Sequence, residues 1–246
     1  MAPALTALVT GSTRGIGAAI ATALELRGVT VIGHGSRGSP GANGDLIGAD
    51  FAEPSAPQAL WEMALERSNG RIDVLINNAG LFAPNPIEAS DIAWLDAWED
   101  TQRINLTSAA QLSRFAVRRW LADRAAGEVR GRVVNIASRA AHRGDSPDHW
   151  HYAAAKAGMV AMTKTIARAY ARQGVLAFAV CPGFTDTDMA GDYLDSRGGP
   201  GLLADIPLGR VAAPDEIAAI AAFCALDAPP SMTGAVLDAN GASYVR

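Results

Sequence analysis

Cysteine, basic charge and long apolar runs are all scarce in this sequence. Only 2 cysteines occur in 246 residues, so a disulfide framework does not organise the chain. Cys181 and Cys224 stand among apolar residues and are expected to be buried, reduced thiols, although the sequence alone also allows a disulfide between them. The formal net charge of −4 and the scattered arginines argue against a nucleic-acid-binding surface.

Membrane and secretion signals are also lacking. No stretch approaches the ~18 uninterrupted apolar residues of a membrane span. The first residues, Met1-Ala2-Pro3-Ala4, do not begin a secretory signal. We therefore expect a cytoplasmic protein with no membrane and no nucleic acid among its partners.

The sequence does contain a regular alternation of β-rich apolar runs with alanine-rich helical patterns. With 49% hydrophobic residues, the chain can bury a large core. The alternation predicts an α/β fold, a single Rossmann-like doubly wound parallel sheet with helices on both faces, in one domain over residues 1–246. The expected strands are 5–10, 29–33, 46–49, 74–77, 132–137, 176–180 and 235–237. The expected helices are about 16–26, 57–67, 101–122, 152–173 and 214–226.

One crossover departs from this alternation. The segment 38–44 is too rich in glycine and too short for a crossover helix. We interpret it as a loop that leads into the short third strand.

A glycine-rich turn follows the first strand, where doubly wound sheets bind dinucleotides. Gly11, Gly15 and Gly17 permit a tight turn and let a pyrophosphate approach the N–H groups of the next helix. The spacing differs from the common G-x-G-x-x-G pattern, and a purely structural turn is the alternative.

The end of the second strand indicates which cofactor is preferred. Sites for NAD place a carboxylate there, whereas an arginine accommodates the 2′-phosphate of NADP. This chain has Ser36 and Arg37 there and no carboxylate before Asp45, while Arg14 lies inside the glycine turn. NADP(H) is therefore favoured and NAD(H) remains possible; solvated loop arginines are the alternative reading.

Tyr152 and Lys156 lie one helical turn apart and so share a face of the expected helix. A nearby ammonium favours the phenolate and can lower the phenol pKa from its ordinary value of about 10 by ~1–3 units. The tyrosine then serves as a general acid for a carbonyl oxygen or as a base for an alcohol. Such a pair alone is also typical of a ring packed on the core beside a solvated lysine.

Taken together, the motifs resemble those of the short-chain dehydrogenase/reductase family over essentially the whole chain. They occur in the family's order and are Thr10-Gly11-x-x-x-Gly15-Ile16-Gly17, Asp50, Asn77-Asn78-Ala79-Gly80, Asn105, Ser138, Tyr152/Lys156, Pro182-Gly183, Thr185 and Thr187. Within the family the chain is most similar to 3-oxoacyl-[acyl-carrier-protein] reductases and their paralogues.

This resemblance implies four catalytic residues. Tyr152 would exchange a proton with the substrate, and Ser138 would bind the substrate carbonyl. Lys156 would lower the pKa of Tyr152 and hold the nicotinamide ribose. Asn105 would keep a water that links Lys156 to solvent. The residues expected to bind the cofactor are Gly11, Thr13, Arg14, Gly15, Ile16, Gly17, Ser36, Arg37, Asp50, Phe51, Asn78, Ala79, Gly80, Tyr152, Lys156, Pro182, Gly183, Thr185 and Thr187.

The resemblance also implies a substrate loop at about 184–211 and a homotetramer built from helices 101–122 and 152–173 and from the last strand. An acyl carrier protein is a possible partner, with Arg130 and Arg172 as candidate contacts. Trp94, Trp98 and Trp150 either shape the pocket or pack in the core and between subunits.

No metal site is expected, because His149-x-His151 lacks further ligands at metal-like spacing. The leading interpretation is an NADP(H)-dependent reductase of a ketone, such as a 3-oxoacyl thioester. An NAD(P)-dependent dehydrogenase of a sugar or small alcohol is the second. The third is a non-catalytic, cofactor-binding regulator or scaffold, a class that usually loses the tyrosine or the lysine.

Overall fold

The computed structural model describes residues 4–37, 39–41, 44–122, 129–187 and 199–246. Within them lies one sheet, with strands in the order β3-β4-β2-β1-β5-β6-β7-β8. The strands are β1 Thr6–Val9, β2 Thr30–Gly35, β3 Ser39–Gly41, β4 Gly44–Gly48, β5 Val74–Asn77, β6 Gly131–Ile136, β7 Val175–Pro182 and β8 Val236–Ala239. All neighbouring pairs are parallel except β3 and β4. The predicted doubly wound α/β sheet is confirmed.

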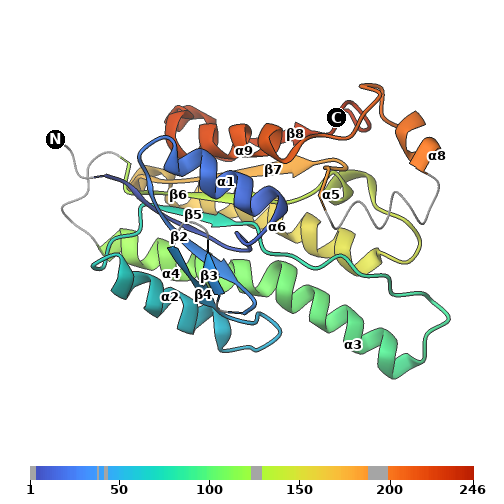
Figure 1. Cartoon of the computed structure of the whole chain (residues 1–246), viewed down its shortest axis with the longest axis horizontal. Coiled ribbons are helices and arrows are strands. Elements are labelled where there is room, and N and C mark those ends of the chain that lie inside the picture. The colour runs from blue at the N-terminus through green and yellow to red at the C-terminus, as the bar shows by residue number, and fades with distance from the viewer. Residues whose placement is uncertain (1–3, 38, 42–43, 123–128, 188–198) are drawn as a thin grey trace.

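Helices cover both faces of the sheet (Figure 1). They are α1 Gly15–Glu25, α2 Ala56–Arg67, α3 Asp91–Gln102, α4 Ser108–Ala122, α5 Ala140–Arg143, α6 Trp150–Tyr170, α8 Gly199–Ala204 and α9 Pro214–Ala222. Short 3₁₀ or π segments are η1 Arg103–Thr107, η2 Ala171–Gln173, η3 Phe223–Asp227 and η4 Pro230–Met232. Among the described residues, no helix is both long and apolar enough to cross a bilayer.

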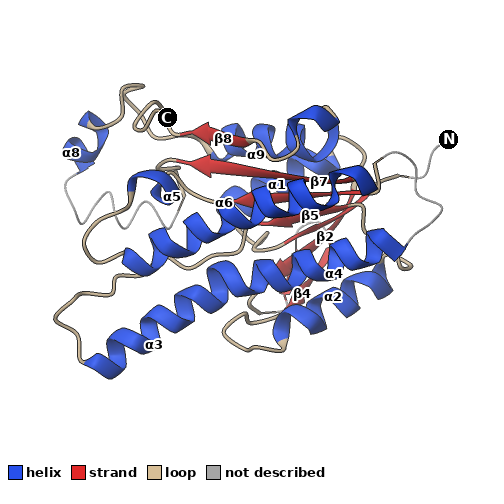
Figure 2. Ribbon diagram, turned by 180° about the vertical axis from the view of Figure 1, so that it is seen from behind, coloured by secondary structure: helices blue, strands red, loops and turns tan. Residues whose placement is uncertain are grey.

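Each face of the sheet has its own apolar core. On one face α2, α4 and α6 pack through residues such as Leu60, Leu112 and Ile166, and Figure 2 shows these helices in front of the strands. On the other face α1 and α9 pack through Leu24 and Ile217. Because helices cover both faces, the sequences of the strands are nearly continuous apolar runs.

The segment expected to be a loop between the second and third predicted strands contains a strand, so that expectation was wrong. β3 pairs antiparallel with β4 on the outer side, while β4 pairs in parallel with β2. The antiparallel β3 returns the chain to the start of β4, so this parallel connection needs no crossover helix.

The helix expected to begin at residue 101 begins ten residues earlier, as α3. Ser90 caps it, its hydroxyl oxygen accepting a hydrogen bond from the Ala93 N–H at 3.3 Å. The helix then continues through the π-helical turn η1 into α4. The π turn contains the buried Asn105, and such π-bulges often mark functional sites.

A chain of buried side-chain hydrogen bonds joins α4, β5, β6 and α6. Asn77 donates to Ser113 Oγ at 3.1 Å and to Asn135 Oδ1 at 2.8 Å. Asn135 in turn donates to Thr163 Oγ1 at 2.8 Å. The Thr163 hydroxyl donates to the Met159 carbonyl of its own helix at 2.8 Å. These bonds set the position of α6 along the sheet, because sliding the helix would leave buried polar groups without partners.

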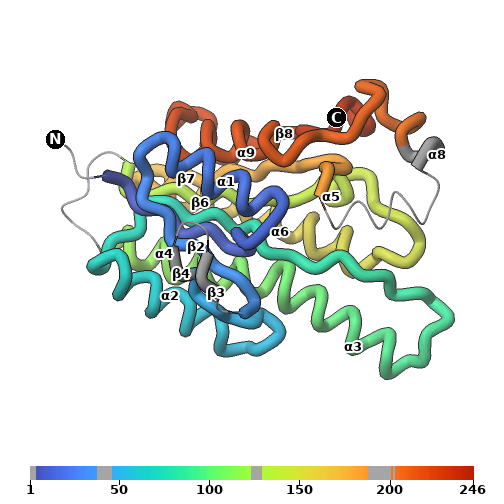
Figure 3. The backbone as a smooth tube through the Cα atoms, viewed as in Figure 1, coloured from blue at the N-terminus to red at the C-terminus, as the bar shows by residue number. Residues whose placement is uncertain are grey.

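Beyond Thr163, α6 continues through η2 to Gly174. Gly174 has a φ of 80°, in the left-handed region, and ends the helix. The backbone trace in Figure 3 shows α5 and α8 at the same end of the molecule. That end lies past the carboxyl ends of β6 and β7.

The buried chain of hydrogen bonds predicts the effect of one pair of matched substitutions. Thr163→Ala should lower the free energy of unfolding by about 1–3 kcal/mol, because Asn135 loses its acceptor inside the core. Thr165→Ala is the control. Its hydroxyl makes the same kind of bond to a helix carbonyl, at 3.0 Å, but is exposed, and the change should stay within about 0.5 kcal/mol. Denaturant unfolding measures both, and equal losses would contradict the proposed role of the chain.

Candidate active site

A cavity of about 450 Å³ opens at the carboxyl ends of the parallel strands. Most residues that the sequence singled out line it: Gly11, Thr13, Arg14, Gly15, Ile16, Gly17, Ser36, Asp50, Phe51, Asn78, Ala79, Gly80, Ser138, Tyr152, Lys156, Pro182, Gly183, Thr185 and Thr187. The lining does not include Arg37 or Asn105. This edge of the sheet is where ligands bind in doubly wound folds.

The glycine turn is shaped for close approach by a ligand. Gly11 and Gly15 have φ of +65° and +54°, which side chains rarely tolerate. A Cβ on Gly17 would lie 2.1 Å from the Gly11 carbonyl oxygen. Arg14, the N-cap residue of α1, makes no capping bond with its side chain. The first N–H groups of α1 therefore suit an anion such as the pyrophosphate of a dinucleotide.

The turn is tied to the loop that follows β5. The Thr10 hydroxyl oxygen accepts from the backbone N–H groups of Asn78 and Ala79, at 2.9 and 3.0 Å. The Asn78 amide donates to the carbonyls of Thr10 and Gly11, at 2.9 and 3.1 Å. The two loops thus hold one another, and Asn78 has a structural task besides any contact with a cofactor.

His34, a residue that sequence reasoning missed, supports the same turn. Its Nδ1 accepts from the Gly11 N–H at 3.1 Å, and its Nε2 contacts the Ala49 carbonyl at 2.8 Å. This pattern requires the neutral ring with the proton on Nε2. Phe51 stacks on the ring, with centroids 4.5 Å apart. Burial lowers the pKa of His34, which keeps the Nδ1 acceptor available.

The two arginines chosen for cofactor preference lie in different places. Arg14 is exposed and lines the cavity. Arg37 is also exposed, two residues past the end of β2, and lies outside the lining. Ser36, next to it, does line the cavity.

Tyr152, Ser138 and Lys156 converge at the inner part of the cavity. The Ser138 side chain is near enough to Tyr152 to lower the pKa of the phenol. Lys156 Nζ donates to the Ile136 carbonyl at 2.8 Å and lies 5.8 Å from the centre of the Tyr152 ring. Ser138 follows β6, and Tyr152 and Lys156 lie on α6.

The pKa values differ from the sequence expectation. Burial raises the pKa of Tyr152 to about 12, and Ser138 opposes this only in part. Burial also lowers the pKa of Lys156 to about 8. The expected net lowering of the Tyr152 pKa is not found, because desolvation, the largest cause of the shift, raises it.

Asn105 is fully buried and acts on the backbone beside the cavity. Its side chain donates to the Leu81 carbonyl at 2.8 Å and accepts from the Leu81 N–H at 2.6 Å. The Asn105 side chain therefore fixes the backbone of the loop that follows Gly80.

The substrate end of the cavity carries aromatic residues that the motifs did not include. Phe82 meets Tyr152 edge-on at 4.8 Å and stacks on His149 at 4.0 Å. The remaining lining residues not foreseen are Gly35, Ala49, Leu81, Ile104, Ile136, Ala137, Arg139, Asp145 and Phe184. Phe82 stands two residues after the Asn-Asn-Ala-Gly motif, and this proximity was the available signal. Residues 188–198 of the expected substrate loop lie outside the described residues.

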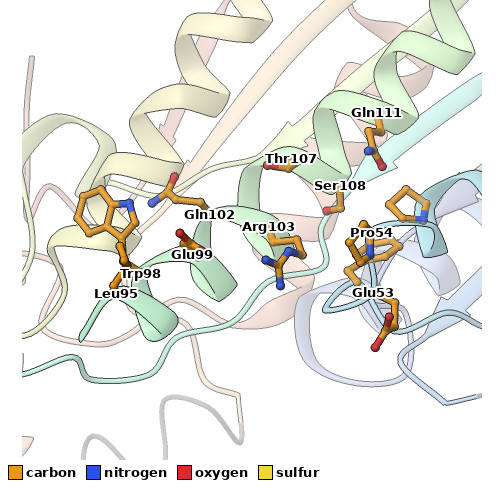
Figure 4. Close-up of a pocket in the computed structure, with 12 residues that line it drawn as sticks. Glu53, Pro54, Leu95, Trp98, Glu99, Gln102, Arg103, Thr107, Ser108 and Gln111 are labelled. Carbon is orange, nitrogen blue, oxygen red and sulfur yellow. The ribbon is translucent and has the colours of Figure 1, made fainter. Parts of the chain in front are cut away.

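A second cavity, of about 420 Å³, runs between α3, η1 and the loop before α2 (Figure 4). Leu95 and Trp98 line it from α3, and Glu53 and Pro54 from the opposite side. Trp94 and Trp98 stack at 5.4 Å, and Trp150 meets Trp94 edge-on at 6.4 Å. None of these three tryptophans lines the cavity that contains Tyr152.

The fold and the site define an oxidoreductase that uses a nicotinamide dinucleotide. A family model described as enoyl-(acyl carrier protein) reductase matches residues 11–241. A 3-oxoacyl-[acyl-carrier-protein] reductase of Salmonella typhimurium is 35% identical over 247 residues, which cover 97% of each chain. The chain belongs to the short-chain dehydrogenase/reductase family, as its motifs predicted, and is an NAD(P)-dependent enzyme of that family.

Two solved structures share the fold. An actinorhodin polyketide ketoreductase with NADPH has a TM-score of 0.84 and 30% identity, with 98% of both chains covered. The aldohexose dehydrogenase of Thermoplasma acidophilum has a TM-score of 0.85 and 27% identity, with 99% of this chain and 95% of that one covered.

The histidines predict how stability depends on pH. Burial is the leading cause that lowers the pKa values of His34, His142 and His151 below 6.5. As the pH falls below about 6.5, these histidines bind protons in the unfolded chain but stay neutral in the folded one. The free energy of unfolding should therefore decline. His34→Gln should reduce the slope by up to about 1.4 kcal/mol per pH unit. Urea unfolding between about pH 8 and pH 5, above the range where carboxylates titrate, measures this. An unchanged slope in His34→Gln would contradict the role given to His34.

Proposed function

We propose that this chain is an NADP(H)-dependent reductase of ketones in which Tyr152 donates the proton. The observation that carries the proposal is that Ser138, Tyr152 and Lys156 line the same cavity as the glycine turn. A dinucleotide on that turn would bring its nicotinamide end toward these residues. The reduced nicotinamide would supply the hydride.

Ser138 and Tyr152 would bind the substrate through its carbonyl oxygen. Hydride addition at the carbonyl carbon leaves negative charge on that oxygen, and two hydroxyl donors stabilise the charge where it develops. Tyr152 then transfers its phenolic proton to the oxygen, and the product is a secondary alcohol. Solvent returns the proton to the tyrosinate.

The pKa values of Tyr152 and Lys156 fit reduction of a ketone to an alcohol. With a pKa of about 12, Tyr152 holds its proton at neutral pH and acts as an acid. With a pKa of about 8, Lys156 is mostly cationic there and stabilises the tyrosinate as it forms.

NADP is favoured over NAD because of the charge around the adenine end of the site. Arg14 lines the cavity, and Arg37 follows Ser36, which also lines it. A guanidinium can bind a 2′-phosphate through two N–H groups. The ketoreductase solved with NADPH supports the same preference.

The substrate class is taken from relatives and from the cavity wall. The similarity to a 3-oxoacyl-[acyl-carrier-protein] reductase supports a 3-oxoacyl thioester. Phe82 and Phe184 give the wall apolar surface. The structural likeness to an aldohexose dehydrogenase supports oxidation of a sugar or small alcohol as the second candidate. Retention of all four catalytic positions disfavours a non-catalytic regulator.

A carrier protein and a homotetramer are further parts of this proposal. Arg130 and Arg172 lie at the amino ends of β6 and β7, away from Tyr152, so they do not support carrier docking beside the cavity of the same subunit. Ile92 and Leu95 on α3 are 76% and 50% exposed. This apolar surface supports subunit pairing along α3 and α4.

Cofactor preference is tested first. With acetoacetyl thioester, NADPH should be consumed rapidly and NADH slowly. The Arg14→Gln/Arg37→Gln variant should raise the KM for NADPH by about 10–100-fold, since charged hydrogen bonds contribute about 1.5–3 kcal/mol, and should leave the NADH rate unchanged. Arg172→Gln, at the far end of the sheet, is the control. Equal use of both cofactors by the wild type would contradict the preference.

The role of Tyr152 is tested by removing its hydroxyl. Tyr152→Phe should lower kcat by at least about 10²-fold, because general acid catalysis contributes about 10²–10⁴-fold. Its Kd for NADPH should stay within a few-fold of the wild-type value, as measured by fluorescence titration. Turnover that survives the substitution would refute the mechanism but not cofactor binding.

A further inference from the structure

Three potential metal ligands meet at the ends of β7 and β8, outside the residues that line the cofactor cavity. They are His142 on α5, Cys181 on β7 and Asp238 on β8, and one ligand atom from each lies within 4.8 Å of the others. Cys181 Sγ and His142 Nε2 are 3.6 Å apart. The mechanism proposed above uses none of the three.

The fold brings these residues together for simple reasons. Cys181 and Asp238 are register partners in the parallel pair β7–β8, so their side chains leave the same face of the sheet. His142 reaches that face because α5 begins two residues after Ser138 and is a single short turn. His142 and Cys181 are 39 residues apart in the chain, which explains why sequence spacing did not reveal the cluster.

The distance between the sulfur and nitrogen atoms matches what one zinc ion requires. Zinc is bound tetrahedrally, with Zn–S of about 2.3 Å and Zn–N of about 2.0–2.1 Å, which places the two ligand atoms about 3.6 Å apart. The observed separation of Sγ and Nε2 equals this value. Thiolate and imidazole together favour zinc over magnesium or calcium, which prefer oxygen ligands. We propose that His142, Cys181 and Asp238 form a zinc-binding site, with solvent as the fourth ligand.

Neighbouring groups orient two of the ligands. The Tyr244 ring stacks on His142, with centroids 5.9 Å apart and planes inclined by 5°. Arg246 Nε donates to Asp238 Oδ2 at 2.9 Å, which leaves Oδ1 for an ion. Asp238 is exposed, so the cluster is open to solvent on the side of this ligand.

Two features weaken zinc binding, and each predicts how the zinc affinity should change. The Arg246 guanidinium is a positive charge that competes for Asp238. Zinc binds the thiolate form of cysteine, so binding must expel the Cys181 proton: the sulfur exchanges its bond to hydrogen for a bond to zinc, and the proton goes to solvent. Zinc affinity should therefore increase with pH and increase when Arg246 is neutralised.

Cobalt(II) titration of the full chain, without a histidine tag, tests the site. One Co²⁺ per chain should give the intense visible bands of tetrahedral cobalt and a thiolate-to-cobalt charge-transfer band, and Zn²⁺ should abolish both. Cys181→Ser should remove the charge-transfer band. His142→Gln and Asp238→Asn should each weaken binding by at least about 10-fold, the lower end of the losses seen for outer-shell changes.

Two further variants complete the test. Cys224→Ser is the matched control, because Cys224 is also buried and has a thiol pKa raised to about 11; it should bind cobalt as the wild type does. Arg246→Gln should bind more tightly. An octahedral spectrum without a thiolate band, or binding that survives both His142→Gln and Asp238→Asn, would overturn the proposal. If Cys181→Ser does not fold, His142→Gln and Asp238→Asn decide the question.

Discussion

The position of α6 on the sheet is the constraint on which the active site depends. The hydrogen bonds from Asn77 through Asn135 to Thr163 lie inside the core, where an unpaired polar group costs more than a paired one contributes. They hold α6 in one register. Tyr152 and Lys156 stand on that helix, and Ser138 follows the strand that contains Asn135. The buried polar chain and the catalytic group are therefore parts of one rigid assembly.

The cofactor side depends on a similar exchange of hydrogen bonds between loops. Thr10 and Asn78 join the glycine turn to the loop after β5, and His34 holds the Gly11 N–H from the other side. Glycines permit the sharp turn but do nothing to stiffen it. These polar neighbours supply the stiffness, so a dinucleotide would meet a turn that is already formed.

Several elements could be predicted because their signals are local. The strands and the helix from residue 152 to Gly174 follow from apolar runs and a glycine stop, and the observed bounds differ by one or two residues at most ends. Two expectations failed, one where tertiary pairing decided and one where a local helix cap was not recognised. β3 has glycine and proline in a strand only three residues long, and it exists because β4 offers it an edge. α3 is rich in aspartate and tryptophan, and its start depended on the Ser90 cap.

By itself the sequence determined the family, the doubly wound sheet and most of the residues that line the cavity, because short motifs at strand ends carry that information. Only the tertiary structure decided how those residues act. It buried Tyr152 and Lys156 so that their pKa values move toward 12 and 8, engaged Asn105 with Leu81, and brought His142, Cys181 and Asp238 to one point. The physical reason is that desolvation, register and contacts between distant segments depend on the packed neighbours, which no local pattern specifies.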